Sequence, residues 1–149
     1  MSIFNAEQFL DMEIEGSNDT VAIPVPMGDY VAVVTDAKTR QWSSKDGLKS
    51  GIALDLIWEI DDAEVKELLG RDKVTCKQGI MLDLTESGSI DMGRGKNLGL
   101  GRLREALDLN DPSRSFTFSM LPGRTARVKV SHRISGEDIF AEIKHVTAI

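Results

Sequence analysis

The chain has 149 residues, 41% of them hydrophobic, and a formal net charge of −6 at pH 7. This length suits one domain around one core, and the hydrophobic content excludes a chain that is disordered throughout. No apolar run approaches the roughly 18 residues of a membrane span. The N-terminus has no basic region before an apolar core, so a secretory signal is not expected. We therefore expect a cytoplasmic location.

The negative charge is confined to the N-terminal part of the chain. Residues 1–29 hold six acidic and no basic side chains, whereas the other 120 residues hold 18 of each sign. Five basic residues and no acidic one lie between Asp111 and Glu137. A surface that serves only solubility normally mixes both signs. Local basic segments, rather than the net charge, are therefore expected to decide which ligands approach.

The N-terminal residues 1–25 are predicted to be an acidic leader, helical or disordered, that precedes a domain over 26–149. The turn-rich stretch Pro24–Gly28 marks the boundary. Four apolar side chains could share one face of a short helix that packs on the domain or on a partner. The alternative is a disordered arm. The four residues are Phe4, Phe9, Leu10 and Ile14.

Three strands are predicted in the first half of the domain. Asp29–Ala37 has β-branched residues at period two, which is typical of a strand. Gly51–Ile60 places Ile52, Leu54, Leu56, Trp58 and Ile60 on one face. Lys73–Leu84 alternates in the same way, with Gly79 as an expected bulge or bend.

One strong helix is predicted over Asn97–Leu109, with Asn97 as its N-cap, and it is followed by strands over Thr125–His132 and Asp138–Val146. Three strands, a helix and two strands is the element order of the OB-fold, a small five-stranded Greek-key barrel. The predicted fold is therefore mainly β: an OB-fold barrel with one helix between its third and fourth strands, plus the leader. A β-sandwich with one helix is the alternative architecture.

Basic residues surround a tryptophan in the predicted loop between the first two strands. Cations that neutralise phosphates beside an aromatic ring that stacks on bases are typical of single-strand binding. The alternative is a solvated hairpin tip in which the tryptophan folds back over the end of the barrel. The residues concerned are Lys38, Arg40, Trp42, Lys45 and Lys49.

Further basic residues are expected on the outward faces of two strands and before the helix. Arg127 and Lys129 alternate with apolar residues, as do Lys73 and Lys77 on the third strand. The stretch Gly93–Asn97 could present backbone amides to a phosphate at the start of the helix. It does not have the spacing of a P-loop, so nucleotide hydrolysis is not indicated.

Signals for catalysis are weak, and no catalytic, metal or cofactor site is predicted. His132 and His145 lie in no metal-binding or catalytic motif, and Cys76 is expected to be a buried, inert thiol. The acidic group around Asp61 and Asp62 suits a solvated turn better than a metal cluster. A binding module is therefore favoured over an enzyme.

With these residues in view, the chain resembles a family of phage-encoded single-stranded DNA-binding proteins that was first catalogued as a phage domain of unknown function. The resemblance covers roughly residues 26–146. It implies an OB-fold that coats single-stranded DNA with little sequence preference. It also implies a role in phage replication or recombination in the cytoplasm of the host cell. The matching blocks are Pro26–Val34, Ile52–Ile60, Leu98–Leu103 and Leu121–Val128.

Many single-stranded DNA-binding proteins carry an acidic C-terminal tail that recruits replication partners and competes for the basic groove. This chain ends at Ile149 without one, and its acidic segment is N-terminal. We therefore expect the leader to take the role of that tail, binding replication or recombination proteins and covering the basic surface when DNA is absent. A homo-oligomer is compatible with the sequence.

The predicted DNA-binding residues would contact phosphates or, for the aromatic ones, stack on bases. The alternative function is a protein-interaction or virion-structural barrel that uses its acidic regions to engage a basic partner and binds no nucleic acid. The predicted DNA-binding set is Tyr30, Lys38, Arg40, Trp42, Lys45, Lys49, Lys73, Lys77, Arg94, Lys96, Arg124, Arg127, Lys129, Arg133 and Phe140.

Overall fold

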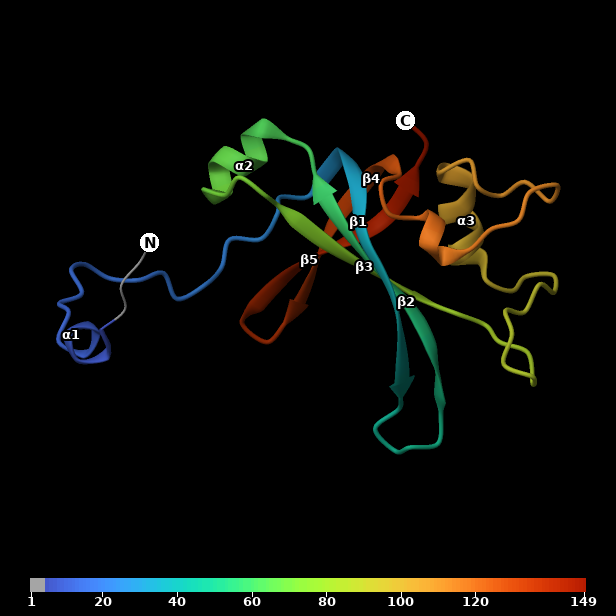
Figure 1. The fold of residues 1–149 in the computed structure, drawn as a ribbon, viewed down its shortest axis with the longest axis horizontal. Coiled ribbons are helices and arrows are strands. Elements are labelled where there is room, and N and C mark those ends of the chain that lie inside the picture. Colours follow the sequence, from blue (N-terminus) through green and yellow to red (C-terminus); the bar gives the residue numbers. More distant parts are fainter. Residues whose placement is uncertain (1–4) are drawn as a thin grey trace.

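A computed structural model describes residues 5–149, which form a mainly β structure. Five strands make one sheet that closes into a ring in the order β1-β2-β3-β5-β4 (Figure 1). Neighbouring strands are antiparallel except β3 and β5, which are parallel. The mainly β class is thereby confirmed. The strands are β1 Gly28–Ser43, β2 Ser50–Ile60, β3 Thr75–Met81, β4 Thr125–Ser135 and β5 Asp138–Thr147.

The long strand β1 belongs to both sides of the ring. Residues Gly28–Val33 pair with β4 and residues Ala32–Ser43 pair with β2, so the two pairings overlap, and the pairing with β2 has a register shift between Val34 and Asp36. Such a bulge bends a strand and increases its twist, which helps a sheet to close. The prediction that β1 ends at Ala37 is wrong: the strand continues to Ser43. Its last residues are polar and lie beyond the core, so no burial pattern marks them as strand.

The core lies inside the ring, and β2 contributes most to it. Leu54, Leu56, Trp58 and Ile60 are fully buried, so the predicted inward face of this strand is confirmed. β3 buries its alternating residues as predicted but ends earlier, at Met81. Its pairing with β2 shows no register shift, so the expected bulge at Gly79 is absent.

One α-helix of the domain was not predicted from the sequence. α2, Ala63–Leu69, lies between β2 and β3, where a solvated acidic turn was expected. The side chain of Asp62 accepts a hydrogen bond from the Val65 amide at 3.0 Å and so caps the helix. Gly70 ends it with a left-handed φ of 64°. Asp62 is therefore a capping residue.

α3, Leu98–Ala106, is the helix that was predicted between β3 and β4, and it buries Leu100 and Leu103. Asn97 stands at its N-cap position as predicted, but its side chain makes no capping hydrogen bond. The Asn97 amide group instead bonds the backbone of Asp83 and Asp91 at 2.8–2.9 Å. Asn97 thus ties the loop after β3 to the start of α3. The short 3-10 helix η1, Phe118–Met120, leads to β4.

The N-terminal segment leaves the ring and extends away from it (Figure 1). Residues 5–23 are exposed, including the helix α1, Ala6–Leu10, and the predicted apolar residues within this range. Phe4 lies outside the described residues. The chain joins the body at Val25, which is buried and whose carbonyl oxygen lies 2.7 Å from Nε2 of His132.

Candidate nucleic-acid interface

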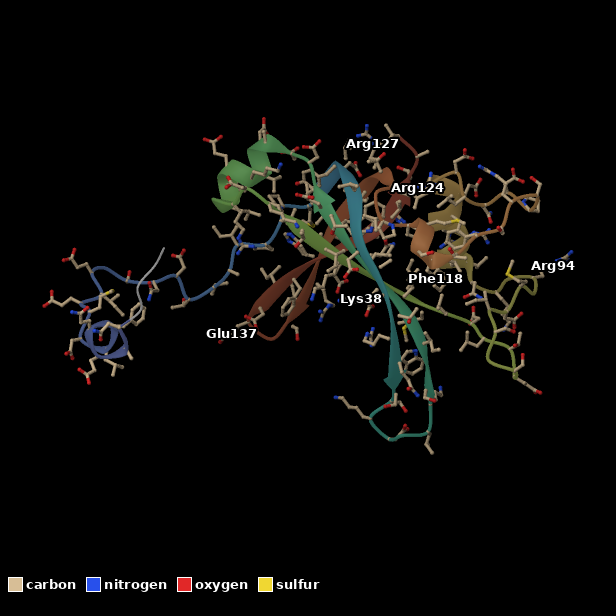
Figure 2. The ribbon with its side chains drawn as sticks, in the orientation of Figure 1. Lys38, Arg94, Phe118, Arg124, Arg127 and Glu137 are labelled. Atoms are coloured by element: carbon tan, nitrogen blue, oxygen red, sulfur yellow. The ribbon has the colours of Figure 1, made fainter. Side chains whose placement is uncertain are left out.

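Three of the predicted residues alternate along the outer face of β1. Lys38 stands opposite Asp55 of β2, and Arg40 and Trp42 follow on the same side. From β3, Lys77 joins this face opposite Ile57. Lys38 lies between the β1–β2 hairpin and the β4–β5 hairpin, whose tip carries Glu137 (Figure 2). The closed sheet thus places cations from separate strands on one surface.

Two adjoining depressions cross this surface. The first has a volume of about 570 Å³ and is lined by Lys38, Arg40 and Lys77. The second, about 610 Å³, lies over β3 and β5 and is lined by Arg133 and Phe140. Both include the β3 residues from Lys77 to Gly79, so they meet at β3 and form one path across the face.

Most cations on this path are paired with an acidic side chain. Lys38 contacts Asp36 at 3.4 Å, and Arg40 contacts Asp55 at 2.8 Å. The hydrogen bond to Asp55 raises the pKa of the Arg40 guanidinium. These pairs are exposed, and exposed ion pairs contribute little to stability. Replacing their carboxylates by phosphates would therefore cost little free energy.

Lys77 and Arg133 differ in how they are held. Within residues 5–149, Lys77 forms no ion pair, whereas Arg133 bonds Glu142 of β5. The Arg133 guanidinium also lies 4.9 Å from the centroid of the Phe140 ring, which is 43% exposed. Phe140 is thus an accessible aromatic surface beside a cation.

Trp42 packs on the neighbouring strand. It stands opposite Gly51, and a β-carbon at Gly51 would come within 2.9 Å of the indole ring. Its Nε1 atom is buried and has no hydrogen-bond partner within the described part of the chain. The indole of Trp42 lies over β2 and not over the end of the closed sheet.

Tyr30 is not placed as a free stacking platform. Its hydroxyl donates a hydrogen bond to the Pro26 carbonyl at 2.7 Å, and its ring packs against the core. Burial raises the pKa of the Tyr30 phenol, and the negative charge of Asp62 adds to the shift. The residue helps to hold the chain where the N-terminal segment meets the ring.

The remaining predicted residues lie on other surfaces. Arg127 and Lys129 project from β4 beside the first half of β1 and line neither depression, and Figure 2 shows Arg127 and Arg124 well away from Lys38. Lys45 and Lys49 are in the turn between β1 and β2 and line neither depression. Those outside the shared face also include Lys73, before β3, and Arg94 and Lys96, in the loop before α3.

Two residues of the path were missed from the sequence. Arg71, just after α2, lines the second depression, but it follows an acidic region that gave no hint of a basic site. Gln78 lines both depressions and accepts a hydrogen bond from Trp58 Nε1 at 2.8 Å. A single glutamine among apolar residues gives no signal of a surface site.

Among residues 5–149, no group of three or more His, Cys, Asp or Glu side chains could hold a metal ion. Within the same range, no helix is long and apolar enough to cross a membrane. Neither the protein-family models nor the curated proteins compared with this sequence give a match.

Proposed function

We propose that the ring is an OB-fold and that it binds single-stranded DNA with little sequence preference. The strand order β1-β2-β3-β5-β4, with a helix between β3 and β4, supports the fold assignment. OB-folds bind nucleic acid over their second and third strands and the loops beside them. The path described above includes residues of β2 and β3 and extends on to β1 at one end and to β4 and β5 at the other.

The observation that carries the proposal is the meeting of the two depressions at Lys77. From this point one depression leads to Lys38 and Arg40 and the other to Arg133 and Phe140. Cations from β1, β3 and β4 would follow the phosphates, and Phe140 would stack on a base without selecting its identity. Trp42 would add a second stacking surface after leaving Gly51.

The same proposal assigns the protein to phage DNA replication or recombination in the host cytoplasm. Support comes from the sequence blocks that resemble phage single-stranded DNA-binding proteins, three of which contribute to β1, β2 and β4. The proposed activity is a coating function, in which the protein protects and presents the strand.

Titration of a fluorescent oligonucleotide at two salt concentrations tests the proposal. Binding should be present at low salt and fall steeply as salt rises, because phosphate contacts release counterions. Lys77→Glu should weaken binding by about tenfold or more, since one charge-assisted phosphate contact contributes on the order of 1.5–3 kcal/mol.

Arg127→Glu is the matched control, because it changes the net charge equally from a strand face outside the path. It should have a much smaller effect. Equal losses in both variants would show that binding follows total charge and not this face. No binding by the unchanged protein at low salt would reject DNA binding and favour a protein-interaction module.

A further inference from the structure

A third depression, of about 460 Å³, lies between α3 and the segment that leads into η1. Its walls include Met92, Leu100, Phe116 and Phe118. The two phenylalanine rings meet edge to face with centroids 5.9 Å apart, and the Arg104 guanidinium lies 4.5 Å above Phe116. We call this depression the α3 groove. Its lining is mainly apolar and includes one cation, Arg104.

The surroundings of the α3 groove are basic. Residues 90–124 hold six basic side chains and four acidic ones. Arg94 and Lys96, in the loop between the groove residue Met92 and α3, form no ion pair with any residue between 5 and 149. The groove therefore suits a ligand that is both apolar and acidic.

The exposed N-terminal residues 5–23 have this chemistry. They hold five acidic side chains and no basic one. Between the acidic residues, Leu10, Met12 and Ile14 are 84%, 61% and 78% exposed. Several large apolar side chains exposed together commonly mark an interaction site.

The segment and the α3 groove lie at opposite ends of the molecule. Figure 1 shows α1 at one end of the longest axis and α3 at the other, and Figure 2 shows Arg94 and Phe118 on the α3 side. The segment is fixed at its inner end, where Val25 is buried and Pro26 accepts the hydrogen bond of Tyr30. It thus points away from the groove of its own chain.

We propose that residues 5–23 of one copy dock in the α3 groove of a second copy. Apolar side chains around Leu10–Ile14 enter the groove, and the acidic residues beside them face Arg94 and Lys96, which follow Met92 in the chain. The first copy then keeps a free groove and the second copy a free segment, so the contact is head to tail and successive copies form a row. This inference does not depend on DNA binding.

Two variants of the full chain test the contact. The segment variant carries Leu10→Asp and Ile14→Asp, and the groove variant carries Met92→Asp and Arg94→Glu; all four positions are exposed. Sedimentation without DNA should show that the mass of the unchanged protein rises with concentration and falls back with salt. Each variant alone should remain a monomer.

The mixture of the two variants is the decisive measurement. The groove variant keeps its segment and the segment variant keeps its groove, so an equimolar mixture should form dimers and nothing larger. A mixture that stays monomeric would overturn the proposal, as would an unchanged protein that is monomeric at every concentration. In that second case, protection of the segment from protease would indicate docking on its own chain.

A control variant with Lys66→Glu and Leu68→Asp carries the same kind of change on α2, far from the α3 groove. It should associate like the unchanged protein. Loss of association in this control would attribute the effect to net charge and reject the groove as the docking site.

Discussion

The two tryptophans differ in how their indole N–H groups are satisfied. Trp58 is fully buried and donates to Gln78 Oε1 at 2.8 Å. Trp42 also buries its Nε1 atom, but that atom has no partner within residues 5–149. A buried donor with a partner contributes to stability, whereas one without a partner costs free energy. The same chemical group should therefore have opposite effects at the two positions.

Replacing each tryptophan by phenylalanine tests this difference. Trp58→Phe removes the hydrogen bond and leaves space in the core, so it should lower the free energy of unfolding by roughly 1–3 kcal/mol. Trp42→Phe, the matched control, removes an unpaired donor and should change it by less than about 1 kcal/mol. Urea unfolding followed by circular dichroism measures both. A larger loss at Trp42 than at Trp58 would contradict the assignment.

The buried thiol of Cys76 should make the free energy of unfolding decrease at alkaline pH. Burial raises the pKa of the Cys76 thiol from 9.0 to about 11, and the charge of Glu142 adds to the shift. Between these values the unfolded chain loses the thiol proton while the folded chain keeps it. The folded state therefore binds more protons, and stability falls as pH rises through this window.

Urea unfolding at a series of pH values checks this contribution. The free energy of unfolding of the unchanged protein should decrease more steeply between pH 9 and about 11 than that of Cys76→Ala. Below pH 8 the two curves should run parallel, with the variant lower because it has lost buried volume. Identical slopes above pH 9 would show that the thiol is accessible to water.

At the scale of elements, α2 depends on its two ends. Its sequence is short, and the acidic residues before it look like a turn, but the Asp62 side chain caps the Val65 amide and Gly70 closes its last turn. Helix ends with such caps are stabilised by about 1 kcal/mol each. The neighbouring Asp61 has an exposed side chain without a hydrogen bond or ion pair in the described chain.

The adjacent aspartates form a matched pair for mutation. Asp62→Ala should lower the free energy of unfolding by about 1 kcal/mol because the Val65 amide loses its acceptor. Asp61→Ala should leave it within about 0.5 kcal/mol. Thermal or urea unfolding of the two variants distinguishes them, and an equal effect would mean that the capping bond contributes nothing.

The elements show which parts of the fold could be predicted from the sequence. The burial of alternate residues in β2 was predictable, because the strand has one face in the core and hydrophobic residues at period two. The end of β1 was not, because its polar residues pair with β2 outside the core. The role of Asn97 was missed for another reason: its partners, Asp83 and Asp91, are close only after the loop has folded.

At the scale of the whole molecule, the candidate site depends on how the strands are ordered. The sequence indicated that Lys77 and Arg127 each face outward, and this is confirmed. It could not indicate that β3 lies next to β5 while β4 returns to β1, which puts Lys77 on the path and Arg127 outside it. The outward orientation of these side chains was therefore predictable, but their grouping on one surface was not.

The exposed N-terminal segment should behave separately from the ring in dilute solution. A glutamate-specific protease should cut after Glu13 and Glu15 much faster than after Glu86, which lies in a loop held by hydrogen bonds between Thr85 and Ser89. The trimmed protein should unfold in urea at the same midpoint, because the residues removed by cleavage after Glu15 are exposed throughout the described range 5–15. Mass spectrometry of early digests identifies the sites. Earlier cleavage at Glu86 would contradict this division.

The ring closes between β3 and β5 through a single paired position, Lys77 with Glu142. The pairings β1–β2, β2–β3 and β4–β5 each join strands that follow one another in the chain, so these three pairings can form early. The pairing of β1 with β4 is the other extensive one, and it joins strands that are far apart in the chain. The chain should therefore fold as two units, β1-β2-β3 and the β4–β5 hairpin, before it closes. The β3–β5 junction would then be the last contact to form and the first to open. In the native state, its amide hydrogens should exchange with solvent before those of β2.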